Sequence, residues 1–92
     1  MKIELSASER RHLKSLAHSL NPVVAIGNQG LTPAVLREIA VNLDAHELIK
    51  IRVFSDDRAI RGELLTHICD ELDAAPVQHI GKLLVIWRPS GK

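Results

Sequence analysis

Apolar residues recur along this chain with two periods, one typical of helices and the other typical of strands. The segment HELIKIRVF, residues 46–54, alternates between apolar and charged side chains at its centre. Because successive residues of a strand point to opposite faces, this segment predicts a strand with one face exposed. Its inward residues are Ile49, Ile51 and Val53, and its outward residues are Lys50 and Arg52. The two cations either extend a basic surface or cover the sheet with their aliphatic stems.

Three segments with apolar residues at intervals of three and four predict helices, and each begins with a capping signal. Ser6 and Glu9 form a capping box at the first helix. Thr32 caps the second helix, and Pro33 follows at the first helical position, where its missing N–H costs nothing. Residues 55–57, a serine and two aspartates, open the third helix, where carboxylates suit the positive helix end. The helices are expected to end before residues 21–22 (Asn-Pro), near Asp44 and before residues 74–76 (AAP). The inward residues are Leu13, Leu16, Ala17 and Leu20 in the first helix, Val35, Leu36, Ile39, Ala40 and Leu43 in the second, and Ile60, Leu64, Leu65, Ile68 and Leu72 in the third.

The remaining apolar segments predict further strands. PVVAI, residues 22–26, is apolar on both faces, which favours a position inside a sheet. Residues 77–80 and 83–88 flank a Gly81–Lys82 turn and predict a closing hairpin. The element order is therefore α-β-α-β-α-β-β. A chain of 92 residues supplies one core, so we expect a single compact α/β domain over residues 1–92, with a four-stranded mixed sheet.

Charge is unevenly distributed, although the net charge is only +1. Residues 1–37 hold five cations and two acids, residues 38–75 hold four cations and nine acids, and residues 76–92 hold three cations and no acid. If the two ends meet in space they form a basic face; alternatively, the distribution has no function. No apolar run reaches the length of a membrane span and the N-terminus lacks a signal peptide, so we expect a cytoplasmic protein.

Gly27, Asn28, Gln29 and Gly30 form a GxxG loop between the strand at 22–26 and the second helix. Glycine permits positive φ, and it removes side chains that would hold a ligand away from the backbone. The helix that follows offers unpaired N–H groups and the positive end of its dipole, which suit a phosphate. No lysine follows Gly30 and no third glycine is present, which excludes a P-loop and a dinucleotide fingerprint. A bare GxxG is typical of a nucleic-acid backbone clamp, although plain turn chemistry also explains it.

The first helix has a cationic stripe opposite its apolar one. Its residues, Arg10, Arg11, Lys14 and His18, fall within an arc of about 100°. The stripe is either a phosphate-binding surface or a solvated helix face, and His18 has a second interpretation as a cap of the helix end. Phe54 and Trp87 are the only aromatic residues, and both lie in apolar strands, so we expect them in the core and expect no base stacking.

Catalytic and metal-binding patterns are absent from the sequence. Asp56 and Asp57 are explained by capping, Cys69 has no partner at metal-ligand spacing, and no histidine stands in a nucleophile pattern. We therefore expect a non-catalytic protein that uses no cofactor, no metal, no small-molecule substrate and no membrane.

Three ordered blocks carry a family resemblance: RRHLKSLAHSLNPVVAIGNQGLT at 10–32, EIAVNLDAHELIKIRV at 38–53 and VQHIGKLLVIWRP at 77–89. With these blocks the chain resembles the CRM-domain (YhbY-like) family of small RNA-binding proteins. The resemblance implies a fold similar to the C-terminal domain of bacterial translation initiation factor three, binding to structured RNA, and association with precursors of the large ribosomal subunit. It places RNA contacts at the GxxG loop and the first helix, giving the candidate set Gly27, Asn28, Gln29, Gly30, Thr32, Arg10, Arg11, Lys14 and His18.

Many family members carry a basic residue inside the loop, whereas Asn28 and Gln29 are neutral here. Amides donate hydrogen bonds but release no counterions, so this loop should contribute little to salt-dependent affinity. The resulting hypothesis is a monomer that binds ribosomal RNA with the GxxG loop and the first helix side by side. The alternative is an adaptor whose acidic segment, residues 38–75, docks a ribosomal protein or an assembly factor.

Overall fold

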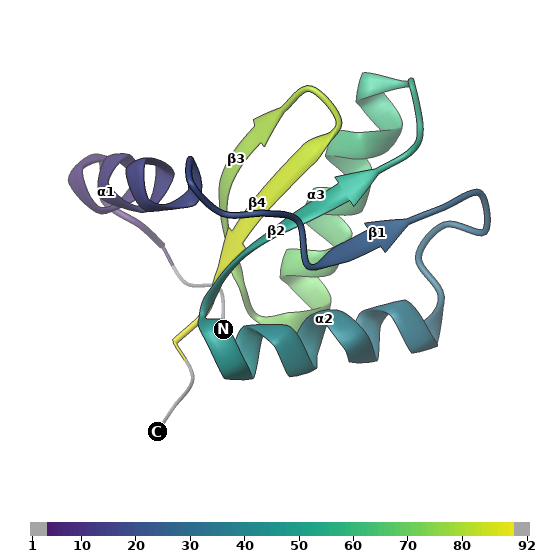
Figure 1. Ribbon diagram of the computed structural model, residues 1–92, viewed down its shortest axis with the longest axis horizontal. Coiled ribbons are helices and arrows are strands. Elements are labelled where there is room, and N and C mark those ends of the chain that lie inside the picture. The colour runs from purple at the N-terminus through teal and green to yellow at the C-terminus, as the bar shows by residue number, and fades with distance from the viewer. Residues whose placement is uncertain (1–3, 90–92) are drawn as a thin grey trace.

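The computed structural model describes residues 4–89, which form one α/β domain (Figure 1). Its sheet has the strand order β1-β2-β4-β3, with β1 parallel to β2 and the other pairs antiparallel. The predicted fold class, element order and mixed four-stranded sheet are therefore confirmed. The elements are α1 (Ala7–Ala17), β1 (Val24–Ile26), α2 (Pro33–His46), β2 (Leu48–Val53), α3 (Arg58–Leu72), β3 (Ala75–Ile80) and β4 (Leu83–Trp87).

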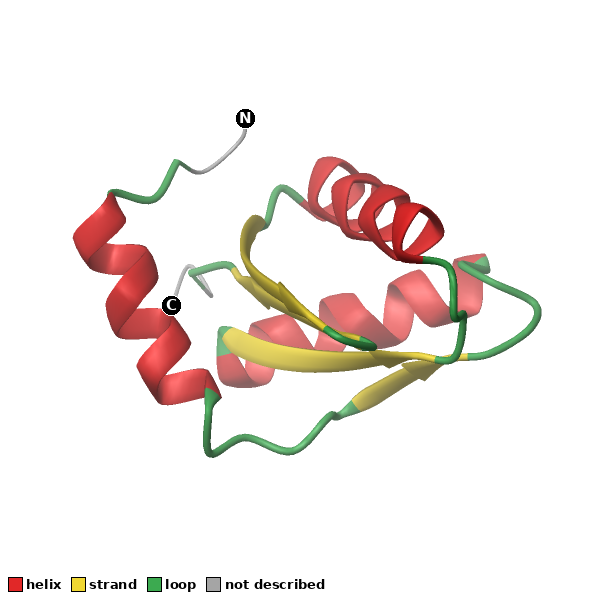
Figure 2. Ribbon diagram, turned by 90° about the horizontal axis from the view of Figure 1, so that it is seen from above, coloured by secondary structure: helices red, strands yellow, loops and turns green. Residues whose placement is uncertain are grey.

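The two faces of the sheet are covered unequally, as Figure 2 shows from above. Helices α2 and α3 pack on one face over the main core, which holds Ile39 and Leu43 of α2 and Ile68 of α3. Helix α1 crosses only one end of the other face, where Leu13 and Ala17 pack against Val77, Val85 and Trp87 in a smaller cluster. Much of that second face therefore stays uncovered.

The predicted helix starts are confirmed. Ser6 and Glu9 exchange the two hydrogen bonds of a capping box. The hydroxyl oxygen of Thr32 accepts the Val35 amide at 3.2 Å. A carboxylate oxygen of Asp57 accepts the amides of the first turn of α3. These caps satisfy backbone donors that the helices leave without internal partners.

The predicted interior position of the strand at 22–26 is wrong. β1 is an edge strand, and Val23 and Ala25 are exposed. The apolar run misled the prediction because only Val24 and Ile26 enter the core, while the other face of β1 has no helix over it.

Three residues assigned to buried helix faces are also exposed. Leu16 and Leu20 line a shallow hollow with Val23 and Lys50, because α1 sits at the rim of the sheet and buries only a narrow side. Ile60 is 46% exposed in the first turn of α3, because it lines an open hollow with Ile26 and Gly27. The second helix runs two residues farther than expected, to His46.

Candidate nucleic-acid interface

The uncovered part of the sheet lies beyond α1, on the face opposite α2 and α3. Alternation along β2 sends Ile49, Ile51 and Val53 into the main core and the intervening residues to the other side. None of the residues on this uncovered face is acidic. We call them the open face: Ala25 of β1, Lys50 and Arg52 of β2, Phe54 just after β2, Gln78 and Ile80 of β3, and Leu83 of β4.

The cationic stripe of α1 borders this open face. Arg11, Lys14 and His18 are exposed and Arg10 is half-buried. Arg10 and Lys14 line a hollow with Gln78 of the edge strand β3. His18 is the C-cap residue of α1, and its own amide donates to the Lys14 carbonyl at 3.1 Å while its side chain stays exposed. Both roles considered for His18 are compatible with this position.

The GxxG loop is a tight turn whose middle side chains face solvent. The Gly30 amide donates to the Gly27 carbonyl at 3.0 Å. Gly30 has a φ of +71°, a backbone conformation that residues with a side chain rarely adopt. Gly27 lacks such a φ, and a Cβ added there would meet no atom within 4 Å. Nothing in the described fold therefore requires glycine at position 27, and its missing side chain leaves the backbone open to a ligand.

The start of α2 offers fewer free amides than expected. Pro33 has no N–H, and the Val35 amide already donates to the Thr32 hydroxyl. Among the first three positions of α2, only Ala34 keeps an amide for a ligand at this helix end. A phosphate held here would depend mainly on the loop backbone and on the side chains of Asn28 and Gln29.

The loop and the cationic stripe do not lie side by side, contrary to the expectation. Figures 1 and 2 both place α1 at one end of the longest axis and the loop between β1 and α2 at the other. That axis is 33 Å long. β1 carries the chain away from α1, and the open face with Lys50 and Arg52 lies between the two ends. A ligand that contacts both must run along the open face.

The acids of residues 38–75 lie on the opposite side of the molecule, whereas Glu9 lies in the first turn of α1. The nine acids of residues 38–75 are all on α2 or α3 or in the turns that flank these helices. Two of them, Asp56 and Asp57, come near the loop end, where both carboxylates have internal partners. Asp57 caps α3, and Asp56 pairs with Lys82 at 2.6 Å. The hydrogen bond from Lys82, followed by its positive charge, lowers the pKa of Asp56 below its usual value.

The N-terminal and C-terminal segments meet, since α1 packs against Val85 and Trp87 of β4. The C-terminal cations Lys82 and Arg88 nevertheless do not join the basic surface. Lys82 forms an ion pair with Asp56. Arg88 donates to the Leu72 and Ala40 carbonyls and pairs with Asp44 at 2.8 Å. Arg88 thereby ties α3 to α2, which is a structural role.

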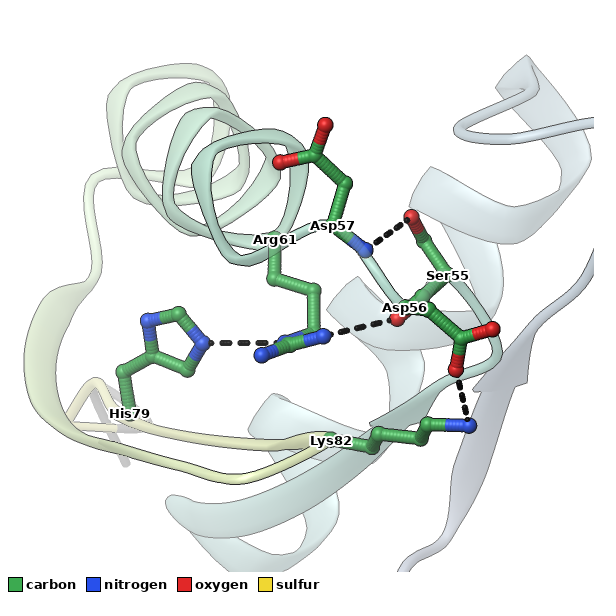
Figure 3. A network of polar contacts seen from close by, with 6 residues as sticks. All are labelled: Ser55, Asp56, Asp57, Arg61, His79 and Lys82. Atoms are coloured by element: carbon green, nitrogen blue, oxygen red, sulfur yellow. Dashed lines mark hydrogen bonds and ion pairs between the residues drawn. The ribbon is translucent and has the colours of Figure 1, made fainter.

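A buried arginine holds the β2–α3 turn against the β3–β4 hairpin (Figure 3). Arg61, only 7% exposed, donates from its Nε to Nε2 of His79 at 3.2 Å and from Nη1 to the Ser55 carbonyl at 2.8 Å. Burial lowers the pKa of His79, and the charges of Arg58 and Arg61 lower it further. The neutral imidazole therefore acts as a hydrogen-bond acceptor that keeps Arg61 in place.

Sequence reasoning missed the exposure of Phe54. The ring was expected in the core, but it is 50% exposed on the open face, whereas Trp87 packs under α1 as expected. A signal for this was available, because Phe54 has the same parity along the strand as Lys50 and Arg52. The role of Arg61 carried no sequence signal, since its partners come from distant segments.

Residues 4–89 contain no group of three or more histidine, cysteine or acidic side chains able to hold a metal ion. No helix within this range has both the length and the apolar character needed to cross a membrane.

The chain is similar to known proteins along nearly its whole length. The family model of the CRS1/YhbY (CRM) domain matches residues 5–88. An RNA-binding protein of Haemophilus influenzae is 49% identical over 86 residues, which cover 94% of this chain and 87% of the relative. A protein of Pseudomonas aeruginosa described as a probable RNA-binding protein is 35% identical, over 96% of this chain and 85% of its own length. A solution structure from Staphylococcus aureus, described as a candidate RNA-binding protein, has a TM-score of 0.86 and 31% identity, covering 97% of this chain and 93% of that one.

Proposed function

Because the chain belongs to the CRS1/YhbY (CRM) domain family, we propose that it binds structured RNA as a monomer and without catalysis. The target we propose is ribosomal RNA in precursors of the large subunit, in line with the family resemblance. The contact surface consists of the cationic stripe, the open face and the GxxG loop, which follow one another along the longest axis of the molecule.

The separation of charge between the two sides of the sheet carries this proposal. The stripe and the open face bring together Arg10, Arg11, Lys14, Lys50 and Arg52, and the nine acids of residues 38–75 fall on the α2 and α3 side. RNA backbones bind where cations gather without competing carboxylates, because each phosphate contact releases condensed counterions.

The two ends have different roles in this mechanism. The stripe supplies Coulomb attraction, which acts over a Debye length of about 10 Å in moderate salt. The loop supplies neutral hydrogen-bond donors and a backbone that a sugar–phosphate strand can approach at Gly27. Lys50 and Arg52 bridge the two ends along β2.

Salt dependence tests the proposal. About five phosphate contacts should give a log–log slope of affinity against salt of about −4 when an RNA hairpin is titrated by fluorescence anisotropy. Crosslinking in cells, followed by sequencing of the attached RNA, should recover large-subunit ribosomal RNA. An adaptor that docks a protein through its acidic segment would instead show a slope near zero and would stay on particles whose exposed RNA has been digested.

A further inference from the structure

Phe54 and Arg52 place two flat groups together on the open face. The Arg52 guanidinium carbon lies 5.2 Å from the centre of the Phe54 ring, which is a cation–π distance. The guanidinium lies over one face of the ring, and half of the Phe54 surface nevertheless remains exposed. A planar surface of mixed aromatic and cationic character is therefore accessible at the end of β2.

The neighbouring strand, β1, is the edge strand of the sheet and does not cover this surface. Ala25 pairs with Arg52 in the β1–β2 register, and it carries only a methyl group. The Phe54 amide donates to the Ile26 carbonyl at 3.1 Å, which places the backbone of residue 54 beside the start of the GxxG loop. Gly27, the first residue of that loop, has no side chain that could cover the ring. A flat ligand can enter from the β1 edge without displacing any side chain of β1.

Exposure alone would not distinguish Phe54 from other surface apolar residues. Val41 on α2 is 61% exposed, and isolated residues of this kind are ordinary. Phe54 differs because it is aromatic, contacts a guanidinium, and lies on a face with the cations Lys50 and Arg52 and no acid. Nucleobases stack on aromatic rings and on arginine planes, and a polyanion brings them to such a face.

We propose that Phe54 and Arg52 form a stacking site for one unpaired nucleobase of the bound RNA. This site rests on the proposed RNA-binding function and adds a base-binding position to it, next to the point where the backbone reaches Gly27. It favours RNA with a bulge, a loop or a single-stranded end over a continuous duplex. Because every base has a π-face, the site discriminates weakly between bases.

Two RNA probes separate stacking from backbone contact. The first is an RNA hairpin with a single-stranded adenosine tail, and the second is the same hairpin with abasic residues in the tail. The intact protein should bind the first probe about tenfold more tightly than the second, because base–aromatic stacking contributes at about this level. Phe54→Leu should remove this difference by weakening the first probe about tenfold, and it should leave the abasic probe unchanged.

Two control variants define the result. Phe54→Trp keeps a ring and should retain the preference for the adenosine tail, while Val41→Ala removes an equally exposed apolar side chain from α2 and should change neither affinity. Because the Phe54 ring is half-exposed, Phe54→Leu should melt close to the parent temperature. Equal binding of both probes by the parent would overturn the stacking site and leave RNA binding intact, and so would an equal loss on both probes in Phe54→Leu. Absence of binding to either probe would overturn the proposed function as well.

Discussion

The two ends of the long axis offer RNA different chemistry. At one end, Arg11 and Lys14 of α1 are exposed to solvent. The buried residues of this helix are Leu13 and Ala17. At the other end the GxxG loop presents neutral amides and glycines. The first end attracts a polyanion from a distance, and the second contacts it only at short range.

This difference indicates separate roles for the two ends: one for the affinity for RNA and the other for the position of RNA on the protein. In the proposed mechanism, charge on α1 sets the salt dependence, whereas the loop and Phe54 set where the strand lies on the protein. The ends are separated along an axis of 33 Å, the length of about ten stacked nucleotides at 3.4 Å each. RNA shorter than this would contact one end only, so affinity should rise with length up to about this size.

Reversal of charge on α1 should have the largest effect on binding. Arg11→Glu combined with Lys14→Glu changes four units of charge on the stripe, and we expect RNA affinity to fall about a hundredfold or more. Both side chains are exposed, so the thermal unfolding midpoint should stay close to that of the parent. The matched control is Arg37→Glu with Arg58→Glu, an equal change on exposed sites of α2 and α3. If the control loses as much affinity as the α1 variant, the effect comes from net charge and the stripe has no special role.

Neutralisation of the middle of the open face should have an intermediate effect. Lys50→Gln with Arg52→Gln removes two cations, so the log–log salt slope should become shallower by about 1.6 and affinity should fall about tenfold. Anisotropy titrations over a salt series measure both quantities. An unchanged slope would mean that RNA passes from α1 without contacting β2.

Alanine substitution of each glycine separates the binding role of the loop from its folding role. Gly27→Ala should keep the free energy of unfolding and lower RNA affinity about fivefold, because the added methyl group meets no protein atom but obstructs an approaching strand. Gly30→Ala should cost about 1 kcal/mol of stability, because position 30 has a φ of +71°. Urea unfolding and anisotropy on both variants test this pair. A stability loss in Gly27→Ala equal to that in Gly30→Ala would contradict the assignment.

The smallest expected effect is a loss of stability as pH falls. RNA binding at the two ends should be compared above the pH at which this loss begins. His79 has a pKa below 6.5 in the folded protein, so the unfolded chain takes up a proton first as pH falls. Stability should therefore be complete above about pH 6.5 and should decline as pH falls toward the lower folded pKa. His79→Gln, which keeps an acceptor for Arg61, should flatten this decline in urea midpoints measured from pH 8 to pH 5. A decline in the variant as steep as in the parent would mean that another group controls this range.

Local features of the fold could be predicted because their causes are local. The capping box at Ser6, the Thr32–Pro33 start and the alternation around Ile51 depend on neighbouring residues, and the structure confirms all three. Burial was harder to predict where it depends on what covers a face. Leu16 and Ile60 have the correct helical spacing for a core, yet each lines an open hollow and remains exposed.

The arrangement of the candidate site depended on long-range geometry. Helix α1 and the GxxG loop are close in sequence, which suggested that they are close in space. The connecting segment, residues 18–26, leads from α1 through β1 toward the other end of the molecule, so the two features are close in sequence but far apart in space. The parity of Phe54 with Lys50 and Arg52 indicated the face on which it lies, but its exposure also requires that no helix covers this part of the sheet, which depends on the packing of distant segments.

The central claim is that one RNA contacts α1, the open face and the loop at the same time. Backbone amide shifts of isotope-labelled protein, recorded by NMR as a tailed RNA hairpin is added, test it most directly. We predict shifts at Arg10–Lys14, at Lys50–Phe54 and at residues 27–30, with the outer sides of α2 and α3 unchanged. Shifts confined to α2 and α3, or to one end of the molecule at saturating RNA, would contradict it.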